Sequence, residues 1–201
     1  GKQGTDMEEN HVKKSYRLVM IGGSAGSLDA ILKILSALPG SFPVPVVIVL
    51  HRKNSNDTLL TDLLSTKTNL RVKEAEEKEP IRPGHLYIAP ADYHLLIEKD
   101  HSFSLDDSEK INYSRPSIDA TFETAADVYS SSLIGILLSG ANTDGVEGLK
   151  KIKQSGGLTI VQEPDSAEVS YMPQQAINNV DVDIVADAAA IGGVLIGLLG
   201  G

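Results

Sequence analysis

The chain of 201 residues contains no cysteine. This absence excludes disulfide bonds, a cysteine nucleophile and thiolate ligands for a metal ion. A catalytic nucleophile in this protein must therefore carry oxygen or nitrogen. A chain without cysteine also suits a reducing compartment, and we expect a cytoplasmic location.

Basic residues are few relative to acidic residues. The chain has 18 Lys and Arg against 27 Asp and Glu, which gives a net charge of −9 with neutral histidines, and no stretch gathers the basic residues together. This balance argues against a nucleic-acid partner. Hydrophobic residues make up 41% and charged residues 22%, which is ordinary for a globular protein. We therefore expect a folded domain with a packed core.

Long apolar segments are also missing. Residues 1–15 contain no apolar run, so we expect a flexible lead-in rather than a signal peptide. The longest uncharged stretch follows Asp187 and is shorter than the roughly 20 residues that cross a bilayer. The sequence thus predicts a single domain over residues 16–201 without membrane insertion.

Apolar runs that alternate with helical patterns dominate the sequence. Buried strands are predicted at residues 17–21, 46–50, 133–138, 158–162 and 183–185. A helical pattern follows each of the first four runs, which predicts an α/β class: a doubly wound, mostly parallel sheet flanked by helices. Shorter candidates lie at residues 70–75, 85–88, 94–98 and 103–105, and we expect them to form a short antiparallel insertion or an extension of the sheet.

The loops after the first three of these buried strands carry unusual polar residues. Ligands of open parallel sheets bind at this carboxyl edge. The first loop, residues 22–27, has the pattern G-x-S-x-G, which exposes the hydroxyl of Ser24 in a sharp strand-to-helix turn. The alternative is a glycine-rich turn in which Ser24 or Ser27 caps the helix. A dinucleotide loop is disfavoured, because G-x-G-x-x-G is absent.

A base and an acid are predicted at the same edge of the sheet. His51 directly follows the second buried strand, and a serine nucleophile needs such a base. Asp144 follows the third buried strand and is suitably placed to orient the imidazole. The alternatives are a structural histidine and a helix-capping aspartate. Asp92 and Asp119 compete for the acid role, although Asp92 follows a peripheral strand and Asp119 opens a helix, where capping suffices.

No other histidine suggests a chemical role. His94 and the remaining three have structural explanations, and no pair has the spacing of metal ligands. We expect neither a metal ion nor a cofactor.

Six segments, taken in order, resemble the catalytic domain of the chemotaxis methylesterases (CheB). They are Val19–Gly26, Val49–His51, Pro83–Pro90, Arg115–Asp119, Leu138–Gly145 and Met172–Ile177. The resemblance implies that Ser24, His51 and Asp144 form a triad. It further implies hydrolysis of glutamate methyl esters on the cytoplasmic helices of chemoreceptors, with deamidation of glutamine side chains at the same site and no cofactor.

The same hypothesis assigns supporting residues. The amides of Ala25 and Ala141 hold the oxyanion, and Arg115 and Ser117 line the substrate cleft. The alternative for this segment is a helix start with Ser117 as its cap. Several positions depart from the family; among them, Ala25 stands where a threonine is common, and Ala141 replaces the methionine of Gly-Met-Gly-x-Asp. No phosphoacceptor receiver domain precedes residue 17, so we expect either a fragment of a longer protein or control by a separate regulator in trans.

Two other functions fit the sequence. A triad hydrolase can act on another ester or amide, because fold and triad do not identify the acyl group. A non-catalytic binding module on the same fold is the third hypothesis, and the departures at Ala25 and Ala141 favour it.

Overall fold

The computed structural model describes residues 15–51 and 57–200. Its centre is a seven-stranded parallel sheet with the order β3-β4-β2-β1-β7-β8-β9. The strands are β1 (Leu18–Gly23), β2 (Val46–Leu50), β3 (Arg71–Glu74), β4 (His85–Ile88), β7 (Leu133–Leu137), β8 (Leu158–Gln162) and β9 (Ile184–Ala186). The order extends outward from β1 in both directions, which confirms the doubly wound class.

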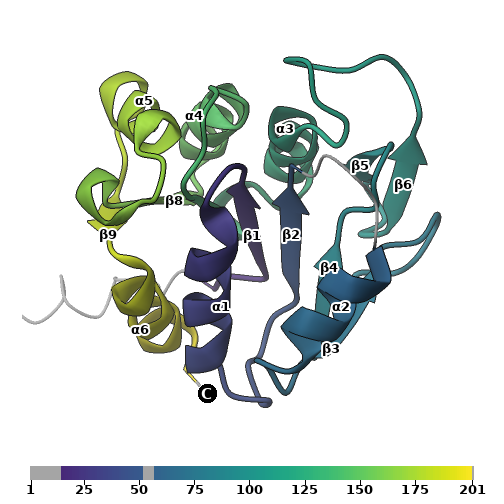
Figure 1. The fold of residues 1–201 in the computed structure, drawn as a ribbon. Helices are drawn as coiled ribbons and strands as arrows, with labels where there is room; N and C mark the ends of the chain where they lie inside the picture. The colour runs from purple at the N-terminus through teal and green to yellow at the C-terminus, as the bar shows by residue number, and fades with distance from the viewer. Residues whose placement is uncertain (1–14, 52–56, 201) are drawn as a thin grey trace, which may run out of the picture.

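Helices cover both faces of the sheet (Figure 1). One face carries α3 (Ile118–Tyr129), α4 (Val146–Gln154) and α5 (Tyr171–Asn179). The other carries α1 (Ser27–Ala37), α2 (Asp57–Ser65) and α6 (Ala188–Leu199). The core is accordingly divided in two: Leu18 and Met20 of β1 enter one cluster, and Val19 and Ile21 enter the other. This alternation follows from the two-residue period of a strand.

The four short strands divide between the two arrangements that the sequence left open. Strands β5 (His94–Ile97) and β6 (Phe103–Asp106) pair antiparallel, which confirms the short antiparallel insertion. By contrast, β3 and β4 pair parallel with each other, and β4 pairs parallel with β2, so both extend the main sheet.

The register of the parallel strands brings the loops that follow β1, β2 and β7 to one edge of the sheet. Gly23 of β1 lies opposite Leu50 of β2, and Gly22 lies opposite Leu137 of β7. The three strands therefore end at the same level, and the chain leaves them beside Ser24, His51 and residues 138–145.

The two ends of the chain carry no candidate site residue. The expected lead-in falls almost wholly on residues 1–14, which lie outside the described residues. No helix in the described part of the chain is both long and apolar enough to cross a bilayer.

Candidate active site

Ser24 lies in the turn between β1 and α1. Its backbone N–H donates to Ser139 O at 3.0 Å, which ties the turn to the end of β7. Gly26 has φ of 75°, and a Cβ there would lie 2.7 Å from Glu168 Cβ, so both the backbone and the space require glycine. Ser27 Oγ donates to Ser24 O, and no side chain caps α1. The turn therefore presents Ser24, and the capping alternative is not realised.

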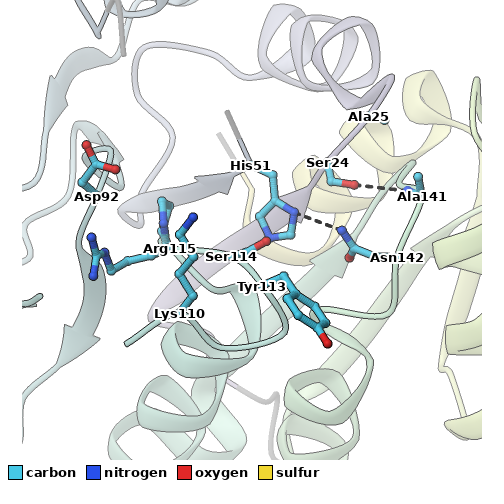
Figure 2. A pocket seen from close by; sticks show the side chains of 11 residues that line it. Ser24, Ala25, His51, Asp92, Lys110, Tyr113, Ser114, Arg115, Ala141 and Asn142 are labelled. Atoms are coloured by element: carbon cyan, nitrogen blue, oxygen red, sulfur yellow. Dashed lines mark hydrogen bonds between the residues drawn. The ribbon is translucent and has the colours of Figure 1, made fainter. Parts of the chain in front are cut away.

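Ser24 opens into a cleft of about 660 Å³ at the carboxyl edge of the sheet. Its lining residues come from five loops (Figure 2): Ser24, Ala25, His51, Asp92, Lys110, Tyr113, Ser114, Arg115, Pro116, Ala141 and Asn142. The two predicted oxyanion residues, Ala25 and Ala141, both belong to this wall. Nucleophile, base and oxyanion amides thus share one space.

His51 and Asp144 form a short hydrogen bond. His51 Nε2 lies 2.6 Å from Asp144 Oδ2, and the Asp144 side chain is fully buried. The carboxylate also accepts from Ile118 N at 2.6 Å, Asp119 N at 3.1 Å and Ser117 Oγ at 2.8 Å. Burial acts to raise the pKa of Asp144, but the hydrogen bonds from His51 and the two backbone amides outweigh it and keep that pKa below its ordinary value. Asp144 is therefore held as an anion beside the imidazole.

Asp144 and Asp119 link helices α3 and α4 through reciprocal hydrogen bonds. Asp144 precedes α4 and accepts from the first amides of α3, whereas Asp119 in α3 accepts from Gly145 N at 2.9 Å and Gly148 N at 2.7 Å at the start of α4. A carboxylate is favoured at a helix N-terminus. This exchange corrects the expectation that Asp119 caps its own helix, since Ser117 caps α3 by accepting from Ala120 N.

Asn112 joins the two buried carboxylates to the cleft wall. Its Nδ2 donates to Asp119 Oδ2 at 2.9 Å and to Asp144 Oδ1 at 3.2 Å. Burial raises the pKa of Asp119 to about 6; the Gly148 N–H opposes this shift and the charge of Asp144 adds to it. The surface segment 109–117 is thereby fastened to the acid of the site.

The raised pKa of Asp119 leads to a stability prediction. A carboxyl group whose pKa is higher in the folded state stabilises the fold fully below its unfolded pKa of 3.8 and loses that contribution as pH rises through about 6. We expect the difference in free energy of unfolding between wild type and Asp119→Asn to fall by about 2–3 kcal/mol between pH 4 and pH 7. Urea unfolding across this range measures it, and a difference independent of pH contradicts it.

Ser24 and His51 lie in the same cleft but do not hydrogen-bond to each other in this structure. Ser24 Oγ accepts from Ala141 N at 3.3 Å, and His51 Nδ1 lies 3.3 Å from Asn142 Nδ2 (Figure 2). Only the His51–Asp144 link of the expected relay is formed. Catalytic hydrogen bonds often tighten only when substrate binds. The Ala141 amide already points at the nucleophile, where an oxyanion would form.

The two residues expected to line the substrate cleft lie in different places. Arg115 lines the cleft, and its Nη1 donates to the backbone oxygens of Asp107 and Ser108 at 3.0 and 3.1 Å. Ser117 is fully buried, and its hydroxyl donates to Asp144. The structure favours the alternative for Ser117, a helix cap, because its hydroxyl accepts from Ala120 N and donates to Asp144 instead of facing the cleft.

The competing acid Asp92 also lines the cleft, but His51 has Asp144 as its carboxylate partner. Among the residues that the structure describes, no three His, Asp or Glu side chains are grouped to hold a metal ion.

Sequence reasoning missed three residues that shape this site: Asn112, Asn142 and His94. His94 is buried; its Nδ1 accepts from Ser117 N at 3.2 Å and its Nε2 donates to Glu109 O at 2.8 Å. It thus holds both ends of segment 109–117. No motif marks any of the three residues, and the one available signal was the position of Asn142 two residues before Asp144.

Comparisons with known proteins point to one family. The family model described as CheB methylesterase matches residues 19–195. A putative protein-glutamate methylesterase/protein-glutamine glutaminase of Leptospira interrogans is 50% identical over 171 residues, covering 85% of this chain and 89% of the relative. The protein-glutamate methylesterase/protein-glutamine glutaminase of Thermotoga maritima is 37% identical over 180 residues, covering 88% of this chain and 52% of the relative.

A solved structure shows the same fold. The crystal structure of the Thermotoga maritima CheB methylesterase catalytic domain superposes with a TM-score of 0.87 at 37% identity, covering 92% of this chain and 99% of that chain. This chain therefore spans most of the Leptospira relative and about half of the longer Thermotoga relative. The extent of the family match and these identities lead to one conclusion: the chain belongs to the CheB methylesterase family.

Proposed function

We propose that this chain is a serine hydrolase that removes methyl esters from glutamate side chains of chemoreceptors and deamidates glutamine side chains at the same site. One observation carries the proposal: His51, bonded to the buried Asp144, shares a cleft with Ser24 Oγ. The relatives named above support the choice of substrate, since their names state both activities. The enzyme acts in the cytoplasm, under a receiver domain in a longer chain or a regulator in trans.

The reaction begins at the ester carbonyl. Ser24 Oγ turns from the Ala141 amide toward His51 Nδ1 and attacks, while His51 takes its proton. Asp144 stabilises the resulting imidazolium through Nε2–H. The freed amide of Ala141, with that of Ala25, holds the oxyanion. Collapse of this intermediate expels methanol, which receives the proton from His51.

Water completes the cycle. His51 removes a proton from the water that attacks the acyl-enzyme, and Ser24 leaves with that proton. The product is free glutamate. A glutamine side chain follows the same path with ammonia as the first leaving group.

The orientation of the imidazole is opposite to that of the serine-protease triad. In that triad the acid binds Nδ1 and the base atom is Nε2. Here Asp144 binds Nε2, so the proton belongs on Nε2 and the lone pair on Nδ1. Nδ1 is therefore the base atom.

Segment 109–117 supplies a rim suited to a protein substrate. Ile111 and Ser114 exchange backbone hydrogen bonds of 3.1 and 2.9 Å across a turn whose central residues, Asn112 and Tyr113, have φ of 51° and 63°. Asn112 reaches inward to the carboxylates, whereas Tyr113 is 98% exposed. We assign this rim, with Arg115 beside it, to docking of an acidic receptor helix.

Tyr113→Ala tests the rim. Loss of one exposed aromatic contact at an interface raises KM for a methylated receptor fragment by about tenfold, an effect of roughly 1–2 kcal/mol. The kcat for a small methyl ester stays unchanged, because that ester does not reach the rim. The control is Leu198→Ala, which truncates an exposed apolar side chain of α6 (39% exposed, against 98% for Tyr113) on the opposite face of the sheet. An unchanged receptor KM removes Tyr113 from the docking surface.

The activity itself is tested by methanol release. Purified protein is incubated with methylated receptor fragments and, in parallel, with a panel of small esters and amides. We expect one methanol per glutamate formed and the highest kcat/KM on the receptor. Higher kcat/KM on another ester or amide supports the alternative hydrolase, whereas binding without turnover supports the non-catalytic module.

A further inference from the structure

Asn142 is fixed in orientation by the backbone of its own loop. Its Oδ1 accepts from Asp144 N at 3.0 Å. The amide oxygen must face that N–H, so the amide nitrogen faces the other way. Nδ2 accordingly lies 3.3 Å from His51 Nδ1, within the cleft (Figure 2). The contact is therefore a donor-to-lone-pair contact, with Asn142 as the donor.

This contact involves the atom that the reaction needs. Asp144 holds His51 Nε2 at 2.6 Å, which places the ring proton on Nε2 and leaves one lone pair on Nδ1. One lone pair accepts one hydrogen bond. While Asn142 donates to it, Ser24 cannot transfer its proton there.

Ala141, the residue before Asn142, holds the nucleophile away from the base. Ser24 Oγ accepts from Ala141 N at 3.3 Å rather than donating to His51. Ala141 therefore engages the nucleophile and Asn142 engages the base, two successive residues of one loop. The nucleophile becomes free when Ser24 Oγ turns from the Ala141 amide, which stays in place for the oxyanion, and the base becomes free when Asn142 Nδ2 leaves His51 Nδ1.

We propose that Asn142 is a positioning residue that occupies the base nitrogen of His51 in the substrate-free enzyme and must release it before Ser24 can react. This inference rests on the proposed function, in which Ser24 and His51 are nucleophile and base. A neutral hydrogen bond of ordinary strength delays the reaction roughly two- to tenfold. Asn142 thus lowers the reactivity of Ser24 in the substrate-free enzyme by that factor.

Two variants of Asn142 separate its two contacts. In Asn142→Ser the hydroxyl still accepts from Asp144 N, as a serine turn does, but is too short to reach His51. In Asn142→Asp one carboxylate oxygen still accepts from Asp144 N. The other oxygen takes the place of the Nδ2 donor beside His51 Nδ1, and as an acceptor it favours a proton on that base atom. Thr143→Ala is the matched control, because Thr143 lies in the same loop with an exposed side chain.

The readout is the second-order rate at which a small fluorophosphonate labels Ser24, measured by mass spectrometry at pH 7.5, together with kcat on a small methyl ester. We expect Asn142→Ser to react two- to tenfold faster than wild type and Asn142→Asp at least tenfold slower, with Thr143→Ala unchanged. Damage to the loop slows an enzyme, so acceleration is a result that a merely structural role does not produce.

Any other result for Asn142→Ser, whether equal to or slower than wild type, overturns the inference. So does an Asn142→Asp protein that reacts as fast as wild type. Failure of the proposed function is distinguished by Ser24→Ala: labelling that persists in this variant shows that Ser24 is not the nucleophile, whatever Asn142 does.

Discussion

Replacement of Ser24 by alanine lowers methyl-ester hydrolysis by up to about 10⁶-fold, the loss found when the nucleophile of a serine-protease triad is removed. The reason is that the remaining groups can only bind substrate and polarise its carbonyl, and no acyl-enzyme forms. Methanol release under kcat/KM conditions measures the loss.

The fold itself survives this change. The bond that secures the turn comes from the backbone N–H of Ser24, which alanine retains. The urea midpoint is therefore expected to stay at the wild-type value. Ser36→Ala, which removes an exposed hydroxyl bonded to Leu32 O in α1, is the control and keeps full activity. A Ser24→Ala protein within tenfold of wild type contradicts the assignment.

Asp144→Asn produces the second large loss, about 10⁴-fold in kcat, by analogy with removal of the triad acid elsewhere. Oδ2 accepts from His51 and Ile118 N, and Oδ1 accepts from Ser117, Asp119 N and Asn112. The –NH₂ group of an asparagine at either oxygen position would face at least two hydrogen-bond donors and could accept from neither. The variant either forces His51 into the wrong tautomer or breaks the contacts at the start of α3.

Asp144→Asn also lowers stability, because buried donors lose their acceptor at about 1–3 kcal/mol each. Single-turnover hydrolysis separates the two effects, since it is measured on folded protein below the unfolding transition. Asp127→Asn removes an exposed carboxylate paired with Lys151 and is the matched charge control. Near-normal kcat in Asp144→Asn means that another acid serves His51.

The sequence predicts those elements of the fold whose own residues carry a recognisable pattern. Fully buried strands such as β1 and β2 consist almost wholly of apolar residues and glycine, so their pattern predicts both the strands and the parallel sheet. For β3 and β4 the same reasoning leaves open whether they form an antiparallel insertion or extend the sheet. Their pairing depends on which neighbours the connecting segments reach, and this information is not local to the strands.

The candidate site divides in the same way. Ser24, His51 and Asp144 follow the ends of three strands, and parallel register alone brings such positions to one edge. The supporting contacts require the angle between α3 and α4, which decides that Asp119 reaches Gly148 rather than its own helix. Asn112 and Asn142 depend on the path of single loops. Periodicity describes neither of these, so the sequence could not predict them.

The most direct test of the account is the site and rate of covalent labelling by fluorophosphonate. The expected result is one adduct per chain, on the peptide that contains Ser24, formed at least about 10²-fold more slowly in His51→Ala and in Asp144→Asn. An adduct on any other residue contradicts the account. So does a Ser24 adduct that forms at the same rate without His51, because the serine would then react without its base.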